Sequence, residues 1–141
     1  MNRTLLPILT IKNTDKLRIL IVDDEPDITI ALKLYLEIQG FQVDAFTDPG
    51  NALAQFKAGF YQLLILDIKM PEMNGFELYT EIKKKDNTVK VFFLTALSEM
   101  HDYDAFKKEV FPKEGERYFI GKPIENEEIL TRINTVIGNT N

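Results

Sequence analysis

The chain of 141 residues is long enough for one domain with a sizeable hydrophobic core. Its 17 basic and 22 acidic residues give a net charge of −5, which disfavours non-specific binding to nucleic acid. It has no cysteine, which excludes a disulfide framework, and no apolar run of the length that spans a bilayer. We therefore expect no nucleic-acid partner and no membrane insertion, and the lack of cysteine is compatible with the cytoplasmic location that we expect.

Residues 1–16 come before the first strand-like segment, and the sequence does not reveal their role. The apolar residues 5–11 follow Arg3, an arrangement that faintly resembles a secretory signal. Pro7 interrupts this stretch, however, and no small-residue cleavage site follows it. We therefore expect an N-terminal tail, either mobile or docked on the domain, rather than a signal peptide.

Strand-like and helix-like segments alternate in the first half of the chain. We expect a buried strand at 17–22, a helix at 27–39 ending at Gly40, a strand at 41–46, and a short helix capped by Asp48 and ended by Gly59. In the helix at 27–39, apolar residues recur at helical spacing and are expected to face the core: Ile28, Ala31, Leu32, Tyr35 and Ile38.

The second half continues the alternation. We expect strands at 63–66, 89–94 and 118–120 and helices at 75–85, 98–109 and 126–137. Pro112 and Gly115 predict a loop before the last strand. Five strands alternating with five helices are typical of an α/β fold with a doubly wound parallel sheet.

Polar residues follow four of the predicted strands. They are Asp23 and Asp24 after the first, Asp67 after the third, Thr95 after the fourth and Lys122 after the fifth. Because the carboxyl ends of parallel strands meet at one edge of a sheet, where such folds bind ligands, we expect these side chains to converge. Carboxylates with one lysine and one hydroxyl suit a divalent cation and a phosphoryl group.

Each of these residues also has an ordinary structural interpretation. Asp24 or Thr95 could cap the helix that follows it, and Lys122 could be a solvated side chain. Phe119 could be a plain core residue. His101 lies among three acidic residues, but such spacing alone rarely makes a metal site, so we expect it to be solvated.

Taken together, the motifs resemble those of response-regulator receiver domains of two-component phosphorelay systems. The matching elements are Asp23-Asp24, Asp67 with the later Met70-Pro71-Glu72-Met73-Asn74-Gly75, Thr95-Ala96, Phe119 and Lys122-Pro123. The resemblance covers residues 17–138 and implies a flavodoxin-like fold with strand order 2-1-3-4-5. It also implies a stand-alone receiver similar to chemotaxis response regulators, with residues 139–141 as a C-terminal tail and no output domain.

The resemblance implies a phosphoacceptor and a metal site. Asp67 would accept the phosphoryl group, and Mg²⁺, for which Mn²⁺ could substitute, would be bound by Asp23, Asp24, Asp67 and the backbone carbonyl of Lys69. A carboxylate cannot readily approach an anionic phosphoryl group unless a cation neutralises the charge between them. Without the ion, the crowded carboxylates should repel one another, and at least one should bind a proton more tightly than usual.

The resemblance also implies a switch. Lys122 would contact phosphoryl oxygens, aimed by a cis peptide bond to Pro123. Thr95 would donate its hydroxyl to the phosphoryl group, and Phe119 would move inward into the space that Thr95 leaves. Ala96 is small and would keep the acceptor accessible. Phosphorylation would thereby change the surface that binds other proteins.

Two functions of different classes remain open. In the first, the chain accepts a phosphoryl group from a sensor histidine kinase or a histidine phosphotransfer protein, with a possible phosphorylation-dependent homodimer. It then either controls an unidentified protein target or, as a relay stage, hands the group on to a histidine phosphotransfer protein. In the second, it is an interaction module that works without phosphorylation. The first function is favoured because the sequence has a suitable residue at each position that phosphorylation requires: Asp23, Asp24, Asp67, Thr95 and Lys122. In neither case would the chain be an enzyme with a separate substrate. A phosphatase with an aspartate nucleophile is disfavoured, because it needs a second aspartate as general acid two residues after the first, and Lys69 stands at that position.

Three departures from the family pattern affect the details. The stretch before the last strand is longer than usual, with an atypical loop at 110–117 on the face that normally binds partners. The switch aromatic is Phe119 rather than tyrosine, so it has no hydroxyl. Lys69 and Leu97 stand beside the path that water would take to the acceptor, from which we expect slow self-dephosphorylation.

Overall fold

The computed structural model describes residues 17–111, 113 and 115–137. The expected tails at 1–16 and 139–141 lie outside these residues. A parallel sheet in the order β2-β1-β3-β4-β5 forms the centre, which confirms the predicted α/β class and strand order. Its strands are β1 (Arg18–Val22), β2 (Gln42–Phe46), β3 (Leu63–Asp67), β4 (Lys90–Ala96) and β5 (Phe119–Lys122).

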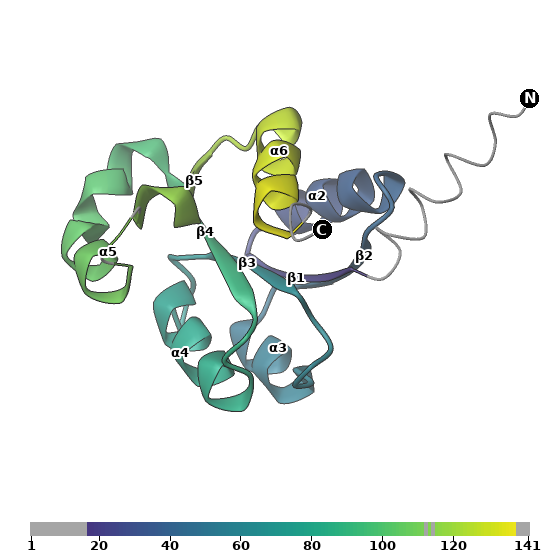
Figure 1. Ribbon diagram of the computed structural model, residues 1–141, viewed down its shortest axis with the longest axis horizontal. Coiled ribbons are helices and arrows are strands. Elements are labelled where there is room, and N and C mark those ends of the chain that lie inside the picture. Colours follow the sequence, from purple (N-terminus) through teal and green to yellow (C-terminus); the bar gives the residue numbers. More distant parts are fainter. Residues whose placement is uncertain (1–16, 112, 114, 138–141) are drawn as a thin grey trace, which may run out of the picture.

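Helices cover both faces of the sheet (Figure 1). Helices α2 (Pro26–Ile38) and α6 (Asn126–Ile137) lie on one face, whereas α3 (Pro49–Gln55) and α4 (Gly75–Lys85) lie on the other. Two separate apolar clusters fill the layers, because alternate residues of each strand point to opposite faces. All five residues of β3 are buried, as expected for a central parallel strand.

Local signals place the helix starts where they were predicted. Asp48 accepts a hydrogen bond from the backbone N–H of Asn51 at 2.9 Å, and so caps α3. Asn74 and Glu77 form a capping box at the start of α4. This cap fixes the end of the loop that leaves β3, and therefore helps to position the acidic edge.

The predicted helix at 98–109 is confirmed in its second half, whereas its first half differs in type. The chain instead forms a 3₁₀ helix, η1 (Leu97–Tyr103), followed by the short helix α5 (Asp104–Val110). Met100, Tyr103 and Phe106 pack against the core at intervals of three residues. An interval of three corresponds to one turn of a 3₁₀ helix and also recurs on one face of an α-helix, so Phe106 of α5 continues the row that begins in η1.

The predicted inner face of α2 is also partly wrong. Its buried residues are Thr29, Leu32 and Leu36, whereas Ile38 is 79% exposed. Two residues along an α-helix correspond to roughly 200°, so Ile38 lies almost opposite Leu36. The helix at 49–58 is likewise shorter than expected, since α3 ends at Gln55.

The atypical stretch before β5 contains a second 3₁₀ turn, η2 (Gly115–Tyr118). Residues 112 and 114 lie outside the described part. Phe111 stacks on Tyr118 with ring centroids 4.1 Å apart, and Phe76 of α4 stacks on Phe106 at 3.7 Å. Phe111, the aromatic residue of the atypical stretch, therefore joins an aromatic cluster with Phe93 of β4, Phe106 and Tyr118.

Candidate functional site

Three carboxylates meet at the carboxyl edge of the sheet. Asp23 and Asp24 directly follow β1, and Asp67 is the last residue of β3. One oxygen from each lies within 4.8 Å of the others. Asp23 and Asp67 are buried, so their mutual repulsion is weakly screened by solvent. The structure thus brings together the side chains that the sequence placed at neighbouring strand ends.

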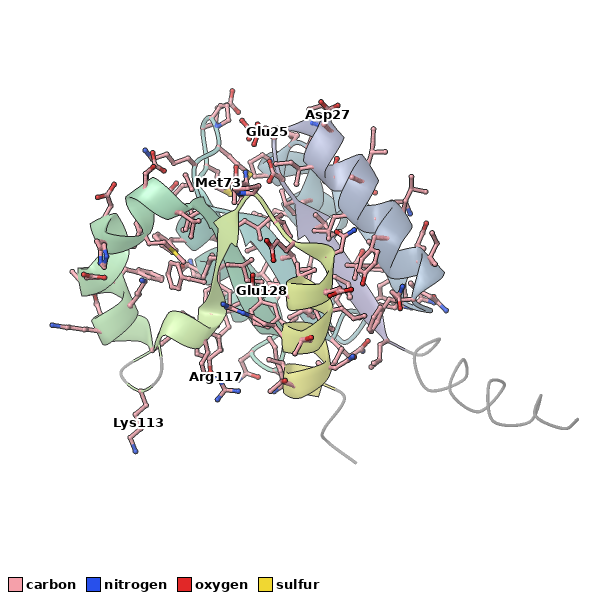
Figure 2. All side chains as sticks on the ribbon, turned by 90° about the horizontal axis from the view of Figure 1, so that it is seen from above. Glu25, Asp27, Met73, Lys113, Arg117 and Glu128 are labelled. Atoms are coloured by element: carbon pink, nitrogen blue, oxygen red, sulfur yellow. The ribbon has the colours of Figure 1, made fainter. Side chains whose placement is uncertain are left out.

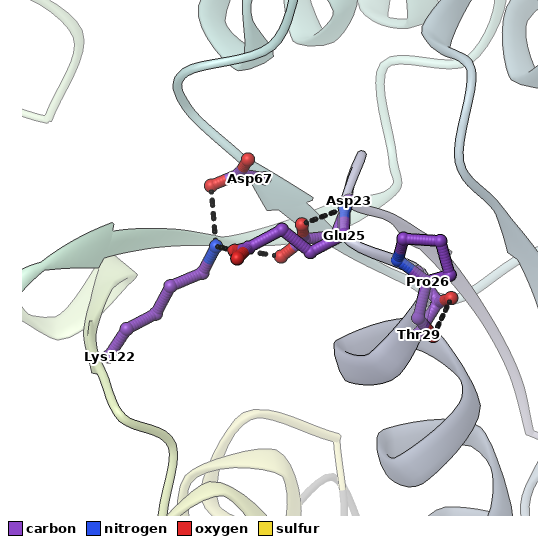
Figure 3. A network of polar contacts seen from close by, with 6 residues as sticks. All are labelled: Asp23, Glu25, Pro26, Thr29, Asp67 and Lys122. Atoms are coloured by element: carbon purple, nitrogen blue, oxygen red, sulfur yellow. Dashed lines mark hydrogen bonds and ion pairs between the residues drawn. The ribbon is translucent and has the colours of Figure 1, made fainter.

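Lys122, the last residue of β5, binds this cluster (Figure 3). Its Nζ lies 2.9 Å from Asp23 Oδ2, 3.0 Å from Glu25 Oε1 and 3.1 Å from Asp67 Oδ1. Burial opposes the ammonium charge, but these carboxylates outweigh it and raise the pKa of Lys122. The peptide bond to Pro123 is cis, as the family resemblance implied.

Burial also raises the pKa values of two of these carboxyl groups, Asp67 and Asp23. Burial, followed by the neighbouring Asp23 charge, raises the pKa of Asp67 to about 7, although Lys122 opposes the change. Burial likewise raises the pKa of Asp23. In the metal-free protein near neutral pH, Asp67 is therefore partly protonated, and a cation that enters the site competes with that proton.

The raised pKa predicts how metal-free stability depends on pH. Between about pH 4 and pH 7, native Asp67 holds a proton that the unfolded chain has lost, so stability falls as pH rises through this window. Asp67→Asn cannot ionise. In EDTA at pH 8 it should raise the free energy of unfolding by on the order of 2 kcal/mol, and at pH 4 by much less.

Urea unfolding of both proteins at the two pH values measures this difference. Asp102→Asn, at an exposed position in η1, is the matched control and should change stability little at either pH. An equal effect of Asp67→Asn at pH 4 and pH 8 would show that Asp67 does not titrate in this range.

A buried hydroxyl lies at the same edge. Thr95 is near the end of β4, and its Oγ1 has no hydrogen-bond partner among the described residues. Since buried polar atoms are nearly always paired, this hydroxyl is available to an added group. Phe119, at the start of β5, is completely buried, with the Lys107 ammonium 4.6 Å from its ring centroid.

The loop after β3 is held close to the site by Gly75. Its backbone N–H donates to the Ile68 carbonyl at 2.8 Å. A Cβ at this position would overlap the Asp67 carbonyl oxygen and lie 3.1 Å from Ile68 Cα. Only glycine allows this close approach of α4 to the backbone of the acidic strand.

Two acidic residues at the site were missed by the sequence reasoning. Glu25 binds Lys122, and Glu99 Oε2 lies 2.8 Å from the Nζ of the exposed Lys69 side chain. Both pairs join residues far apart in the chain, so no local spacing could have revealed them. The metal-binding role of the Lys69 carbonyl stays a prediction.

Several ordinary interpretations find no support. The N-cap of α2 is Glu25, not Asp24, and no side chain caps that helix. Ala96, not Thr95, precedes η1. The ordinary interpretation of His101 does agree with the structure: its side chain is highly exposed, with Nδ1 3.7 Å from Asp104 Oδ2. The group of described residues that could hold a metal ion is Asp23, Asp24 and Asp67.

The donor set at the acidic edge fits a hard divalent cation. It consists of carboxylate oxygens, the ligands that Mg²⁺ prefers. Asp23 Oδ2 is buried and accepts no well-aligned hydrogen bond from the described residues, although the Lys122 ammonium lies 2.9 Å away. A buried oxygen with spare acceptor capacity is a suitable metal ligand.

The fold and the acidic edge place the chain among doubly wound proteins that bind ligands at the carboxyl ends of parallel strands. Comparison with known families is more specific. The model of the response regulator receiver domain matches residues 19–134, and the chain belongs to this family of two-component signalling proteins.

Individual relatives agree with this assignment. The regulatory protein VanRB of Enterococcus faecalis is 34% identical over 86% of this chain and 52% of its own length. A CheY-like receiver domain protein of Methanospirillum hungatei has a TM-score of 0.74 at 30% identity, covering 86% of this chain and 94% of that one. The response regulator TrrA of Thermotoga maritima, in complex with Mg²⁺ and BeF, has a TM-score of 0.67 at 31% identity, covering 86% and 99%.

The chain spans about half or less of the length of the curated relatives it matches. Within the described residues, no helix combines the length and the apolar character needed to cross a membrane.

Proposed function

We propose that this receiver accepts a phosphoryl group from a sensor histidine kinase or a histidine phosphotransfer protein on Asp67, in a reaction that depends on Mg²⁺. The observation that carries the proposal is the Lys122 ammonium bound to Asp23 and Asp67 at the acidic edge. The receiver is taken as residues 17–138, with residues 1–16 and 139–141 as tails. The protein is taken to be cytoplasmic, and its catalysis to be limited to its own phosphorylation and dephosphorylation.

The metal would be held by Asp23, Asp24, Asp67 and the backbone carbonyl of Lys69. When bound, Mg²⁺ supplies positive charge between the Asp67 carboxylate and the phosphoryl oxygens, and Mn²⁺ would serve similarly. The proposal is supported by the three carboxylate oxygens within 4.8 Å of one another and by the spare acceptor capacity of Asp23. It is also in keeping with the complex of TrrA with Mg²⁺ and BeF.

The transfer itself requires ionised Asp67. A carboxylate oxygen of Asp67 attacks the phosphorus of the donor phosphohistidine, and an acyl phosphate forms as the phosphorus–nitrogen bond breaks. The bond's electron pair stays on the imidazole, which takes up a proton. Lys122, 3.1 Å from Asp67 Oδ1, favours the ionised carboxylate and then lies close to the new phosphoryl oxygens.

Thr95 and Phe119 would carry the signal from the acyl phosphate to the surface. The unpartnered Thr95 hydroxyl would donate to a phosphoryl oxygen. Phe119 is buried in this structure, so phosphorylation would stabilise this inward arrangement over an outward one. The partner-binding surface beside β5 would change as a result, including any surface used by a phosphorylation-dependent homodimer.

A groove beside Lys122 suits the phosphoryl donor. It has a volume of about 240 Å³ and runs between α2 and the segment after β5. Its lining is mainly apolar, with Ile28, Ala31, Leu32, Pro123 and Ile124. Because Lys122 also lines it, the groove is continuous with the acceptor site, and a helix that carries the donor histidine would bind there.

One observation favours the second candidate function, an interaction module that works without phosphorylation. Phe119 is already inward, packed against Phe93 with ring centroids 5.5 Å apart and covered by Lys107. If this packing holds Phe119 inward at all times, target binding would not depend on Asp67. If the wild type and Asp67→Ala bound the target equally well, the phosphorylation-independent interaction module would be the supported function.

Incubation with acetyl phosphate, which needs no partner protein, tests the metal-dependent chemistry. We expect the intact mass to increase by one phosphoryl group in Mg²⁺ and to stay unchanged in EDTA, because EDTA removes the divalent cation needed between two anionic groups. Asp24→Asn should weaken the response by raising the Mg²⁺ concentration required. Equal phosphorylation with and without Mg²⁺ would contradict the proposed site.

Lys69 and Leu97 should give the acyl phosphate a long lifetime. Lys69 is tied to Glu99 at 2.8 Å, and the Leu97 side chain lies against Gly121, beside Lys122. Both side chains would obstruct an attacking water. We expect Lys69→Asn combined with Leu97→Glu to shorten the lifetime by about tenfold, which is less than the ~100-fold at the low end of the effect of a fully positioned acid or base. Loss of the phosphoryl mass with time measures it, and an unchanged lifetime would refute the explanation.

A further inference from the structure

Helix α2 is apolar on two opposite faces. Leu32 and Leu36 are buried against the sheet. On the other side, Ile30, Leu34 and Ile38 are 58%, 56% and 79% exposed. These three residues, which we call the outer stripe, are spaced by four and therefore lie on one face.

Among the described residues, these are three of the four large apolar side chains that are exposed. Single exposed apolar side chains are common, but a contiguous row indicates a surface that is covered. Beside the row, Lys33 is already engaged with Glu37 Oε2 at 2.6 Å and with the Val43 carbonyl at 2.8 Å. The helix surface thus presents apolar side chains next to a closed ion pair rather than free charges.

We propose that residues 5–11 of this chain pack on the outer stripe. The chain enters the fold at the right place for this contact. The Leu17 carbonyl accepts a hydrogen bond from Gln42 at 3.0 Å, and the Phe41 N–H donates to Leu36 in the last turns of α2 at 3.1 Å. The start of β1 therefore lies beside the end of α2 that carries Ile38.

The chain length is sufficient for the contact. The five residues between Ile11 and Leu17 make six Cα–Cα steps, which can span up to ~20 Å when extended. The outer stripe, from Ile30 to Ile38, is ~12 Å long at the helical rise of 1.5 Å per residue. Residues 5–11 can therefore reach its whole length without disturbing β1.

The composition of residues 5–11 matches the surface. Five of the seven are large aliphatic residues: Leu5, Leu6, Ile8, Leu9 and Ile11. Pro7 disfavours a continuous helix and favours an extended segment, which can lie along a helix face. The covalent connection also makes this occupant present at a high effective concentration, whereas a second copy must bind from solution.

The proposed contact leaves the phosphoacceptor accessible. The groove beside Lys122 is lined by Ile28 and Ala31 of α2, not by the outer stripe. A bound N-terminal segment would cover the exposed apolar surface while the acidic edge stays open. The proposal therefore holds whether or not Asp67 is phosphorylated.

Disulfide trapping tests the contact directly, because the natural chain has no cysteine. In Leu9→Cys/Leu34→Cys we expect mild oxidation to give a cross-linked monomer, lighter by two hydrogen atoms. It should form at least about tenfold faster than in the control Leu9→Cys/Thr80→Cys, whose second cysteine is on α4 across the sheet. Equal rates in the two variants, or a disulfide-linked dimer as the main product, would overturn the proposal.

A double-mutant cycle supplies a second test that needs no cross-link. Leu9→Ser and Leu34→Ser should each lower Tm by a few degrees, and the double variant should lower it no more than either alone, because both remove the same contact. Additive shifts, or no shift with Leu9→Ser, would overturn the proposal. Thr80→Ser is the matched control at an exposed helix position and should leave Tm unchanged.

Discussion

Replacing Lys122 by methionine should slow phosphoryl transfer from acetyl phosphate to Asp67 by about 100-fold. The Lys122 ammonium lies 3.1 Å from Asp67 Oδ1. Methionine has an unbranched side chain of similar length but carries no charge. Removing one preorganised electrostatic contact from an active site typically costs 100- to 1,000-fold in rate. Bound Mg²⁺ still supplies charge on the other side of the acceptor, so we expect the low end of this range.

The rate of mass gain at saturating Mg²⁺ measures the effect of Lys122→Met. Lys90→Met removes the same charge at an exposed position at the start of β4 and should react like the wild type. If both variants slow equally, net charge rather than the position of Lys122 controls the reaction. A wild-type rate in Lys122→Met would show that the ammonium takes no part in the transfer.

Gly75→Ala should destabilise the domain by about 2–3 kcal/mol and reduce phosphorylation. The added methyl group would overlap the Asp67 carbonyl oxygen, and it is backbone, not a flexible side chain, that must move. Overpacking of this kind costs about 1–3 kcal/mol, and the rigid surroundings favour the upper end. Since the overlap involves Asp67 itself, the displacement is transmitted directly to the phosphoacceptor.

Gly50→Ala is the control for Gly75→Ala. Gly50 also lies in the first turn of a helix, but its added Cβ would be 3.4 Å from the Asp48 carboxylate, close to ordinary contact distance. Urea unfolding should show a large loss of stability for Gly75→Ala and little change for Gly50→Ala. Equal effects would indicate a general cost of changing glycine in a first helical turn rather than a clash with Asp67.

The strands of the sheet and the residues at its acidic edge could be predicted from the sequence, because both depend on local patterns. Continuous apolar runs predicted the buried strands, and β3 is buried at every position. The residues that end those runs, such as Asp67 and Lys122, converge because parallel strands share one carboxyl edge. The strand order came from the family resemblance and agrees with the structure.

The misassignments have physical causes that single-sequence patterns do not contain. Periodicity showed that α2 is apolar but could not decide which of two apolar faces meets the sheet, so Ile38 was placed inside. The spacing of three in Met100, Tyr103 and Phe106 is compatible with either helix type until the core they contact is known.

The partners of the site lysines required the tertiary structure. Glu25 reaches Lys122 across 97 positions of the sequence, and Glu99 reaches Lys69 across 30. Such long-range pairs depend on the sheet order and the loop positions together. They cannot be predicted from the spacing of charged residues in the sequence, which indicates only pairs within a helical turn or along a strand.

The acceptor residue is tested most directly by the intact mass of the wild type, Asp67→Ala and the control Asp48→Ala after incubation with acetyl phosphate and Mg²⁺. We predict a gain of one phosphoryl group in the wild type and Asp48→Ala, and none in Asp67→Ala, because Asp67 supplies the attacking oxygen. An undiminished gain in Asp67→Ala would contradict Asp67 as the phosphoacceptor. No gain in any of the three would favour the phosphorylation-independent interaction module.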